Sequence, residues 1–230
     1  MSATAPAPTP QIEVDEHNAG TLARARAYAL FADCFRHPRE VGDSAADGRL
    51  PAALEAICTA LPFRYTFAGT TPTGDARALG MTYTALFDTV GRSPVVPLLE
   101  RQFAGRLPEQ QLWEELLRFY RHFGLDFSEA GPRESPDHLL VELEFMQYLC
   151  FLEAGAGDAA SAQSLRRGQR DFLERHLVSW LGGLTEALTQ AQEPAPFDLY
   201  AEALARFTAA DLIRLQSEVE DAAPRDAPTG

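Results

Sequence analysis

The stretch ESPDHLLVELEFMQYLCFLEAG, residues 134–155, decides the fold because it predicts a helix that is apolar on most of its faces. At about 100° per residue, His138, Glu142 and Phe145 share one face of that helix, whereas Glu144 lies nearly opposite. A helix with apolar residues on both sides is expected at the centre of a domain. Carboxylates in such a helix need a partner, because an unpaired buried charge is costly.

Three interpretations of the polar residues in this helix are open. Ser135 and Pro136 are predicted as N-cap and first helical residue, and Asp137 falls in the first turn, where the helix dipole favours an acid. The simplest interpretation is a capped helix with a His138–Glu142 pair. A di-iron carboxylate site would require Glu-x-x-His motifs, and the sequence contains none. The third is a recognition site at the mouth of a groove.

The rest of the chain also repeats its apolar residues with a helical period, and no run of alternating strands is present. The sequence therefore predicts an all-α fold. A first helix begins at Asp15 or Asn18 and ends before Pro38, and Asp75 and Pro108 are placed to start two others. The remaining expected helices cover residues 50–61, 165–184 as one long helix, and 197–207 with 212–219 as a final pair.

Composition shifts divide the chain into lobes and tails. Residues 1–18 and 222–230 are rich in Ala and Pro and predict flexible tails, the first without the features of an export signal. Residues 131–136, rich in Gly, Pro and charge, predict a hinge. An N-terminal helical lobe, residues 19–130, would precede it, and a C-terminal lobe, residues 137–221, would follow.

The charged residues exclude several classes of function. The net charge of −13 argues against nucleic acid and anionic lipid as partners and favours a basic peptide, or solubility alone. All 20 basic residues are arginine, so a Walker-A phosphate loop and a pyridoxal Schiff base are excluded. No apolar run approaches the roughly 20 residues of a membrane span, which predicts no stable membrane insertion.

The cysteines and histidines favour a protein that is not an enzyme. Cys34, Cys58 and Cys150 are widely spaced and form no zinc pattern, which predicts buried thiols, no metal and a cytoplasmic location. The sequence has no Gly-x-Ser-x-Gly, His-Glu-x-x-His or Gly-x-Gly-x-x-Gly motif. The remaining histidines are scattered and are interpreted as helix-surface or helix-end residues, among them His176 near Trp180.

Four segments together resemble one family. PDHLLVELEFMQYL, residues 136–149, is similar to the Asp-His-initiated helix of the TorD/DmsD/NarJ-type redox-enzyme maturation chaperones. YTALF, residues 83–87, resembles the Tyr-x-x-Leu-Phe segment of that family, and PVVPLLERQF, residues 94–103, its proline-containing connector. FLERHLVSWLGGL, residues 172–184, resembles its Phe-Leu-x-x-His-Leu-x-x-Trp helix. The matches occur in order and cover most of the chain outside the tails.

The resemblance implies an all-helical fold of two lobes joined by a hinge, as a monomer or an exchanged dimer. It implies a cytoplasmic chaperone that binds the catalytic subunit of a molybdenum enzyme of the dimethyl sulfoxide reductase superfamily until its cofactor is inserted. Many members bind the twin-arginine signal peptide of that subunit. The resemblance implies no cofactor of the protein's own, beyond weak guanine nucleotide binding or transient contact with molybdopterin-guanine-dinucleotide. The client and its substrate are left open.

A twin-arginine peptide has a basic head and an apolar body, so its receptor should combine carboxylates with an apolar groove. Glu100-Arg101 departs from the Glu-Ser of many relatives. The alternatives to a chaperone are a nucleotide- or small-molecule-binding regulatory helical protein and a structural adaptor. The predicted site comprises Asp137, His138, Glu142 and Glu144 for the head, and Tyr83, Phe87, Pro97, Glu100 and Phe103 for the adjoining wall.

Overall fold

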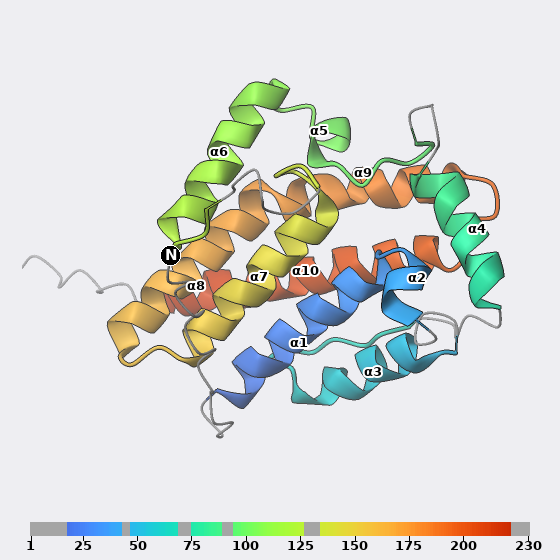
Figure 1. Cartoon of the computed structure of the whole chain (residues 1–230). Helices are drawn as coiled ribbons and strands as arrows, with labels where there is room; N and C mark the ends of the chain where they lie inside the picture. The colour runs from blue at the N-terminus through green and yellow to red at the C-terminus, as the bar shows by residue number, and fades with distance from the viewer. Residues whose placement is uncertain (1–17, 43–46, 69–74, 89–93, 127–133, 222–230) are drawn as a thin grey trace, which may run out of the picture.

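The expected all-α fold is confirmed in the computed structural model, which describes residues 18–42, 47–68, 75–88, 94–126 and 134–221 (Figure 1). Within these residues every regular element is a helix. The predicted tails, apart from Asn18, and residues 131–133 of the predicted hinge lie outside the described part. The elements are α1 Ala19–Cys34, α2 Pro38–Val41, α3 Arg49–Ile57, η2 Cys58–Ala60, α4 Ala76–Phe87, α5 Glu100–Phe103, α6 Glu109–His122, α7 Leu139–Ala154, α8 Ala159–Arg175, α9 Leu177–Gln190 and α10 Phe197–Asp221.

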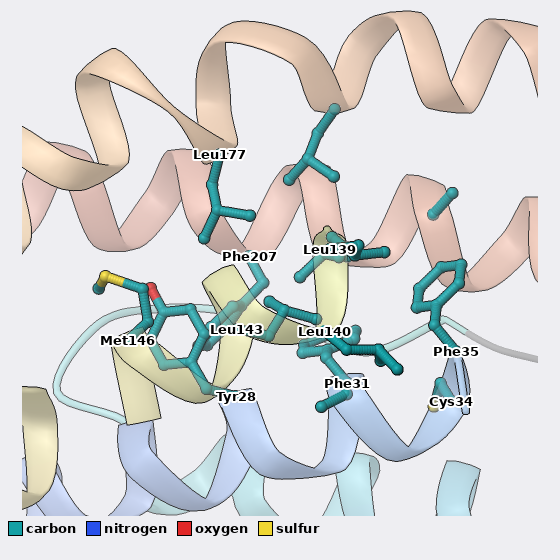
Figure 2. Close-up of a cluster of buried hydrophobic side chains, with 14 of the residues drawn as sticks. Tyr28, Phe31, Cys34, Phe35, Leu139, Leu140, Leu143, Met146, Leu177 and Phe207 are labelled. Carbon is teal, nitrogen blue, oxygen red and sulfur yellow. The ribbon is translucent and has the colours of Figure 1, made fainter. Parts of the chain in front are cut away.

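Helix α7 is the central helix, as its apolar sequence predicts. It runs beside α1 over most of their lengths and also packs against α8 (Figure 1). Figure 2 shows side chains of α1 and α7 meeting those of α9 and α10 in one buried cluster. Each fully buried Leu or Phe of this cluster contributes about 1.5–3 kcal/mol to folding. The labelled members are Tyr28, Phe31, Cys34, Phe35, Leu139, Leu140, Leu143, Met146, Leu177 and Phe207.

The start of α7 differs from the expectation. Ser135 and Pro136 precede the helix, and its N-cap is His138, whose imidazole Nδ1 accepts a hydrogen bond from the backbone N–H of Leu140 at 3.2 Å. The His138 imidazole thus satisfies a backbone donor that the helix itself leaves unpaired. The simplest interpretation of this helix included a His138–Glu142 pair, but the structure gives these side chains other partners, Leu140 N–H and Trp180.

Two further helix boundaries also differ. The expected single helix over residues 165–184 is broken at His176, whose backbone (φ −114°, ψ −98°) separates α8 from α9. The expected pair of C-terminal helices is instead one helix, α10. Asp211 sits in its interior, where aspartate usually favours a helix end because its side chain competes for backbone groups. Here the carboxylate binds other side chains, so the helix continues.

One hydrophobic core joins the two predicted lobes. Helix α1, assigned to the N-terminal lobe, packs against α7 and α10 of the C-terminal lobe. The buried cluster includes side chains from both (Figure 2). The division at residues 131–136 stays a prediction.

A buried ionic cluster lies where α1, α7, α8 and α10 meet. Arg24 of α1 is fully buried, and its Nε and Nη2 donate to Oδ1 and Oδ2 of Asp211 at 2.8 and 2.9 Å. The same guanidinium donates to Glu153 at 3.2 Å and to Gln169 at 2.5 Å. The Gln169 amide in turn donates to Glu153 at 2.9 Å. The buried charge of Arg24 is thus surrounded by side-chain oxygens from three other helices.

The acids of this cluster have additional donors. Tyr28 donates its hydroxyl to Asp211 at 2.8 Å, and Arg214 donates Nε to the same carboxylate at 3.1 Å. Burial opposes the ionisation of Asp211, but the charges of Arg24 and Arg214 and the hydrogen bonds from Arg24 and Tyr28 hold its pKa below its ordinary value. The cluster therefore ties the four helices together through ion pairs and hydrogen bonds.

Candidate functional site

The proline-containing connector, residues 94–103, lies against the start of α7. The backbone N–H of Glu100 donates to the carbonyl of Asp137, and that of Leu139 donates to the carbonyl of Leu98, both at 2.9 Å. These bonds form an isolated antiparallel bridge. The connector and the Asp-His segment, which the sequence predicts to form one site, are thus brought together by backbone pairing.

The Asp137 carboxylate is fully buried and is bound by donors of this chain. Arg101 Nη1 donates to Oδ1 and Oδ2 at 2.6 and 2.8 Å, and the Arg101 backbone N–H lies 3.3 Å from Oδ2. Trp113 Nε1 donates to it at 2.9 Å and Ser135 Oγ at 2.8 Å. The Arg101 guanidinium also lies 5.7 Å from the Trp113 ring centroid. Asp137 therefore fastens the connector and α6 to the start of α7.

Two further carboxylates, Glu100 and Glu142, are buried next to α9. His176 Nδ1 lies 2.9 and 3.1 Å from the two oxygens of Glu100, and Trp180 Nε1 donates to Glu142 Oε2 at 3.1 Å. Each of the four side chains is at most 1% exposed. The His-Leu-x-x-Trp segment thus supplies donors for acids that precede it by 38 and 76 residues.

The environment of Glu142 favours its protonated form. Burial raises the pKa of Glu142 well above its ordinary value, and the nearby charges of Glu100 and Asp137 act in the same direction, against the hydrogen bond from Trp180. Glu142 Oε1 and His176 Nε2 are buried with no hydrogen-bond partner. A neutral carboxyl avoids most of the cost of burying a charge, so this environment favours the acid form of Glu142 over the carboxylate.

His138 lies half-buried between the connector and solvent. Burial lowers the pKa of His138 to about 4, although the charges of Glu134 and Asp137 oppose this shift. The imidazole is therefore neutral near pH 7, which matches its role as an acceptor at the helix N-cap.

The ring of Phe103 closes this buried region on the α9 side. It stacks on Trp180 with centroids 6.0 Å apart and an interplanar angle of 7°. A Cβ at Gly183 would lie 3.0 Å from Phe103 Cβ, so the glycine permits this close approach. Pro97 is half-buried in the connector. The predicted wall residues Glu100 and Phe103 thus lie near the buried acids Asp137 and Glu142. We call this set of residues the buried junction: Glu100, Arg101, Phe103, Trp113, Ser135, Asp137, Glu142, His176 and Trp180.

Tyr83 and Phe87 lie in a separate aromatic cluster. The Phe87 ring meets Phe197 edge-on at 5.1 Å, and the Tyr83 ring meets His37 and Phe87 at 4.9 and 5.0 Å. The Tyr83 hydroxyl donates to the carbonyl of Phe35 at 3.3 Å. Both side chains are half-buried and hold α4 against the ends of α1 and α10.

Glu144 points to the opposite side of α7 and is exposed. Its carboxylate accepts a hydrogen bond from Arg36, and its side chain is 45% accessible. A cavity of about 280 Å³ lies beside it between α6 and α7. Asp126, also exposed, adds a second acid at this cavity. We call this surface the α7 groove; it is lined by Tyr120, Leu125, Asp126, Val141, Glu144, Phe145 and Tyr148.

The predicted head residues are therefore divided between two sides of α7, and only Glu144 among them offers an exposed carboxylate. The partners of the buried acids, Arg101, Trp113 and Trp180, were not predicted from the sequence. The departure at Arg101 was a usable signal, because an arginine beside a connector glutamate can reach an acid on the facing segment.

The described residues were also compared with the requirements of a metal site and of a membrane-spanning helix. No group of three or more His, Cys, Asp or Glu side chains there is arranged to hold a metal ion. No described helix has both the length and the apolar character required to cross a bilayer. Of the three free cysteines, Cys34 and Cys150 are buried as predicted, whereas Cys58 is partly exposed.

Comparison with known proteins places this geometry in context. The family model described as nitrate reductase delta subunit matches residues 44–186, more than half of the chain. The dimethyl sulfide dehydrogenase assembly chaperone protein of Rhodovulum sulfidophilum is 36% identical over 190 residues, which cover 77% of this chain and 75% of that protein. The perchlorate reductase assembly chaperone protein of Dechloromonas aromatica is 36% identical over 173 residues, or 70% and 75% of the two chains.

A shorter alignment has higher identity. The selenate reductase assembly chaperone protein of Thauera selenatis is 45% identical over 100 residues, covering 43% of this chain and 51% of the relative. The alignment with the chlorate reductase assembly chaperone protein of Ideonella dechloratans covers 55% of that relative. The chain thus spans about half the length of these two relatives.

Proposed function

Because the chain belongs to the nitrate reductase delta subunit family, we propose that it is a cytoplasmic assembly chaperone for a molybdenum enzyme. Its client is the catalytic subunit of an enzyme of the dimethyl sulfoxide reductase superfamily. The chaperone binds that subunit, through its twin-arginine signal peptide, until the molybdenum cofactor is inserted. It acts by binding and catalyses no reaction. The observation that carries the proposal is the similarity to named assembly chaperones over 70–77% of the chain.

The α7 groove is the surface that best fits an arginine-bearing peptide. Glu144 and Asp126 place two carboxylates at the rim of a cavity that Tyr120, Phe145 and Tyr148 line with aromatic rings. Carboxylates recognise guanidinium groups through paired hydrogen bonds, and an apolar cavity accepts the body of such a peptide. The net charge of −13 attracts the basic head over a longer range.

Arg36 of this chain already binds Glu144, the acid at the rim of the α7 groove, through its guanidinium group. Its own guanidinium donates to Glu144, so the acid is already placed to bind an arginine. The Arg36 side chain is 30% accessible, and exposed ion pairs contribute little to stability. A client arginine replaces Arg36 on Glu144 at small cost, because one guanidinium–carboxylate contact is exchanged for another.

In this proposal the buried junction does not bind the client but fixes the position of α7, which forms one side of the α7 groove. Asp137 has no free position for a client arginine, since Arg101 donates to both of its oxygens and Trp113 and Ser135 also donate to Oδ1. Asp137 and Glu142 therefore position the start of α7 rather than contact the client. Tyr83 and Phe87 also have a structural role in this proposal, because they pack α4 against the rest of the fold.

The function is tested in the native host, with tagged wild-type or variant chaperone replacing the chromosomal copy. We expect Glu144→Gln to lower the captured catalytic subunit, and the molybdenum content of the client enzyme, by about tenfold, the loss of one charge-assisted contact. Glu174→Gln is the matched control, because Glu174 is an exposed glutamate on α8, away from the groove. It should behave as wild type.

Two outcomes contradict different parts of the proposal. Full molybdenum content in a host that lacks the chaperone altogether would show that the chain does not assemble this enzyme. Equal client levels for Glu144→Gln and Glu174→Gln would leave the chaperone function standing and remove the α7 groove as its receptor. The amount of folded chaperone is measured in each strain.

A further inference from the structure

A second cavity, which the proposed function does not use, lies between α6 and α8. Its volume is about 360 Å³, within the range of small-molecule sites in proteins. Residues spaced by three and four positions on each helix face it, so each helix contributes one continuous stripe. The lining residues are Glu115, Arg118, Phe119, His122 and Phe123 from the α6 side, and Ser164, Arg167, Gly168, Asp171 and Arg175 from α8.

The acids in this lining are already neutralised. Glu115 lies 3.4 Å from Nη1 of Arg175 and 3.6 Å from Nη1 of Arg106. Asp171 accepts from Arg170 at 2.6 Å. The acids of the cavity therefore offer no free charge to a ligand or to the remaining arginines.

Two arginines at the cavity remain without an acid. Arg118 on α6 and Arg167 on α8 are exposed, and neither forms an ion pair within the described part of the chain. Nearby on α8, Arg166 and Arg170 have carboxylate partners. In a chain of net charge −13, two unpaired guanidinium groups facing one cavity are a local cationic site.

Aromatic rings form the wall between these arginines. Phe119 is held edge-on to Phe172 with centroids 5.5 Å apart, and the ring of Phe123 approaches α8 at Gly168. A Cβ at Gly168 would lie 2.3 Å from Phe123 Cζ, so only glycine leaves the ring in this place. His122 meets the Phe123 ring edge-on at 4.8 Å. The cavity thus combines flat apolar surfaces with a cationic rim.

We propose that this cavity binds a small organic anion with a flat aromatic body, in which a phosphate or carboxylate contacts Arg118 and Arg167. The ring of the ligand packs on Phe119 and Phe123. Guanidinium groups recognise both anions through paired donors, and the aromatic wall selects a planar body. This site is separate from the α7 groove and does not depend on the chaperone function.

The proposal is tested by titrating the full-length protein with 1-naphthyl phosphate at low salt and measuring the heat of binding by calorimetry. Two control probes each contain one of the two groups that the site is proposed to recognise. Inorganic phosphate has the anion, and 1-naphthylmethanol has the flat aromatic body. We expect saturable one-to-one binding of 1-naphthyl phosphate and affinities at least about tenfold weaker for both fragments. Arg118→Ala and Arg167→Ala should each weaken the binding of 1-naphthyl phosphate about tenfold. Arg121→Ala, which removes an exposed arginine of α6 outside the cavity, should leave it unchanged.

Several results would overturn the proposal. One is that none of the three probes binds saturably. Another is equal weakening by Arg118→Ala and Arg121→Ala, because that would indicate a diffuse charge effect. A third is binding of a polyglutamate peptide as tight as that of 1-naphthyl phosphate, which would mark an acidic-peptide surface instead. Circular dichroism of each variant confirms that the fold is retained, since all three substituted arginines are exposed.

Discussion

Arg24→Ala is expected to lower the free energy of unfolding by about 3–5 kcal/mol, the cost of leaving buried acids without their partner. The substitution removes the guanidinium that binds Asp211, Glu153 and Gln169 at distances of 2.5–3.2 Å. Arg214 and Tyr28 still contact Asp211 but do not fill the vacated volume. Since domains are stable by only about 5–15 kcal/mol, a large share of the total is lost. Urea denaturation at pH 7 measures it.

Arg26→Ala is the control for this prediction. Arg26 lies two residues further along α1 and is exposed, so its removal should change stability by less than about 0.5 kcal/mol. A second variant, Arg24→Met with Asp211→Asn and Glu153→Gln, removes the charges together and should recover part of the loss. Equal stability of Arg24→Ala and Arg26→Ala would refute the structural role of the ionic cluster.

The second large effect concerns Glu142 and depends on pH. Glu142→Ala is expected to cost about 2–4 kcal/mol, because it leaves a cavity and removes the acceptor of Trp180 Nε1. Glu142→Gln keeps the acceptor and the volume and mimics the protonated acid. At pH 7 it should therefore be at least as stable as the wild type.

The sign of the pH dependence follows from the raised pKa of Glu142 in the fold. Below its ordinary pKa of 4.5 the group is protonated in both the folded and the unfolded state. As the pH rises above 4.5, the unfolded state loses this proton first, so the stability of the wild type falls relative to that of Glu142→Gln. Denaturation curves of both proteins between pH 4.5 and 8 measure the difference. A constant difference over this interval would show that Glu142 is ionised in the fold.

The features that are local in sequence were predictable. Apolar residues on most faces of residues 136–153 indicated that α7 is central, and the helical period elsewhere indicated an all-α fold. The proximity of the connector to the Asp-His segment followed from the family resemblance and is confirmed by the paired backbone at Leu99 and His138.

The features that were not predicted depend on contacts between residues that are far apart in the sequence. Arg24 and Asp211 are 187 residues apart, so neither the burial of the arginine nor the continuity of α10 through Asp211 could be predicted from local pattern. His176, at the break between α8 and α9, likewise has its partner Glu100 76 residues earlier in the chain. Asp137 was predicted to bind the basic head of a peptide, because no local signal indicated that Trp113 and Arg101 would enclose it.

The arrangement of acids on α7 suggests a division of labour. Asp137 and Glu142 face internal donors and fix the helix in the fold, whereas Glu144 faces outward with a replaceable arginine on it. In the proposed function, the buried acids Asp137 and Glu142 therefore stabilise the fold, and the exposed Glu144 binds the client. On this proposal, the Asp-His segment affects client binding only indirectly, by fixing the position of α7.

Calorimetry of the client's N-terminal peptide tests this account most directly. Wild type and Glu144→Gln are titrated with the twin-arginine peptide and with a peptide in which glutamine replaces both arginines. The account predicts saturable binding of the native peptide to wild type, about tenfold weaker binding after either change, and little further loss when the two are combined. Independent, additive losses, or the same affinity of wild type and Glu144→Gln for the native peptide, would contradict it.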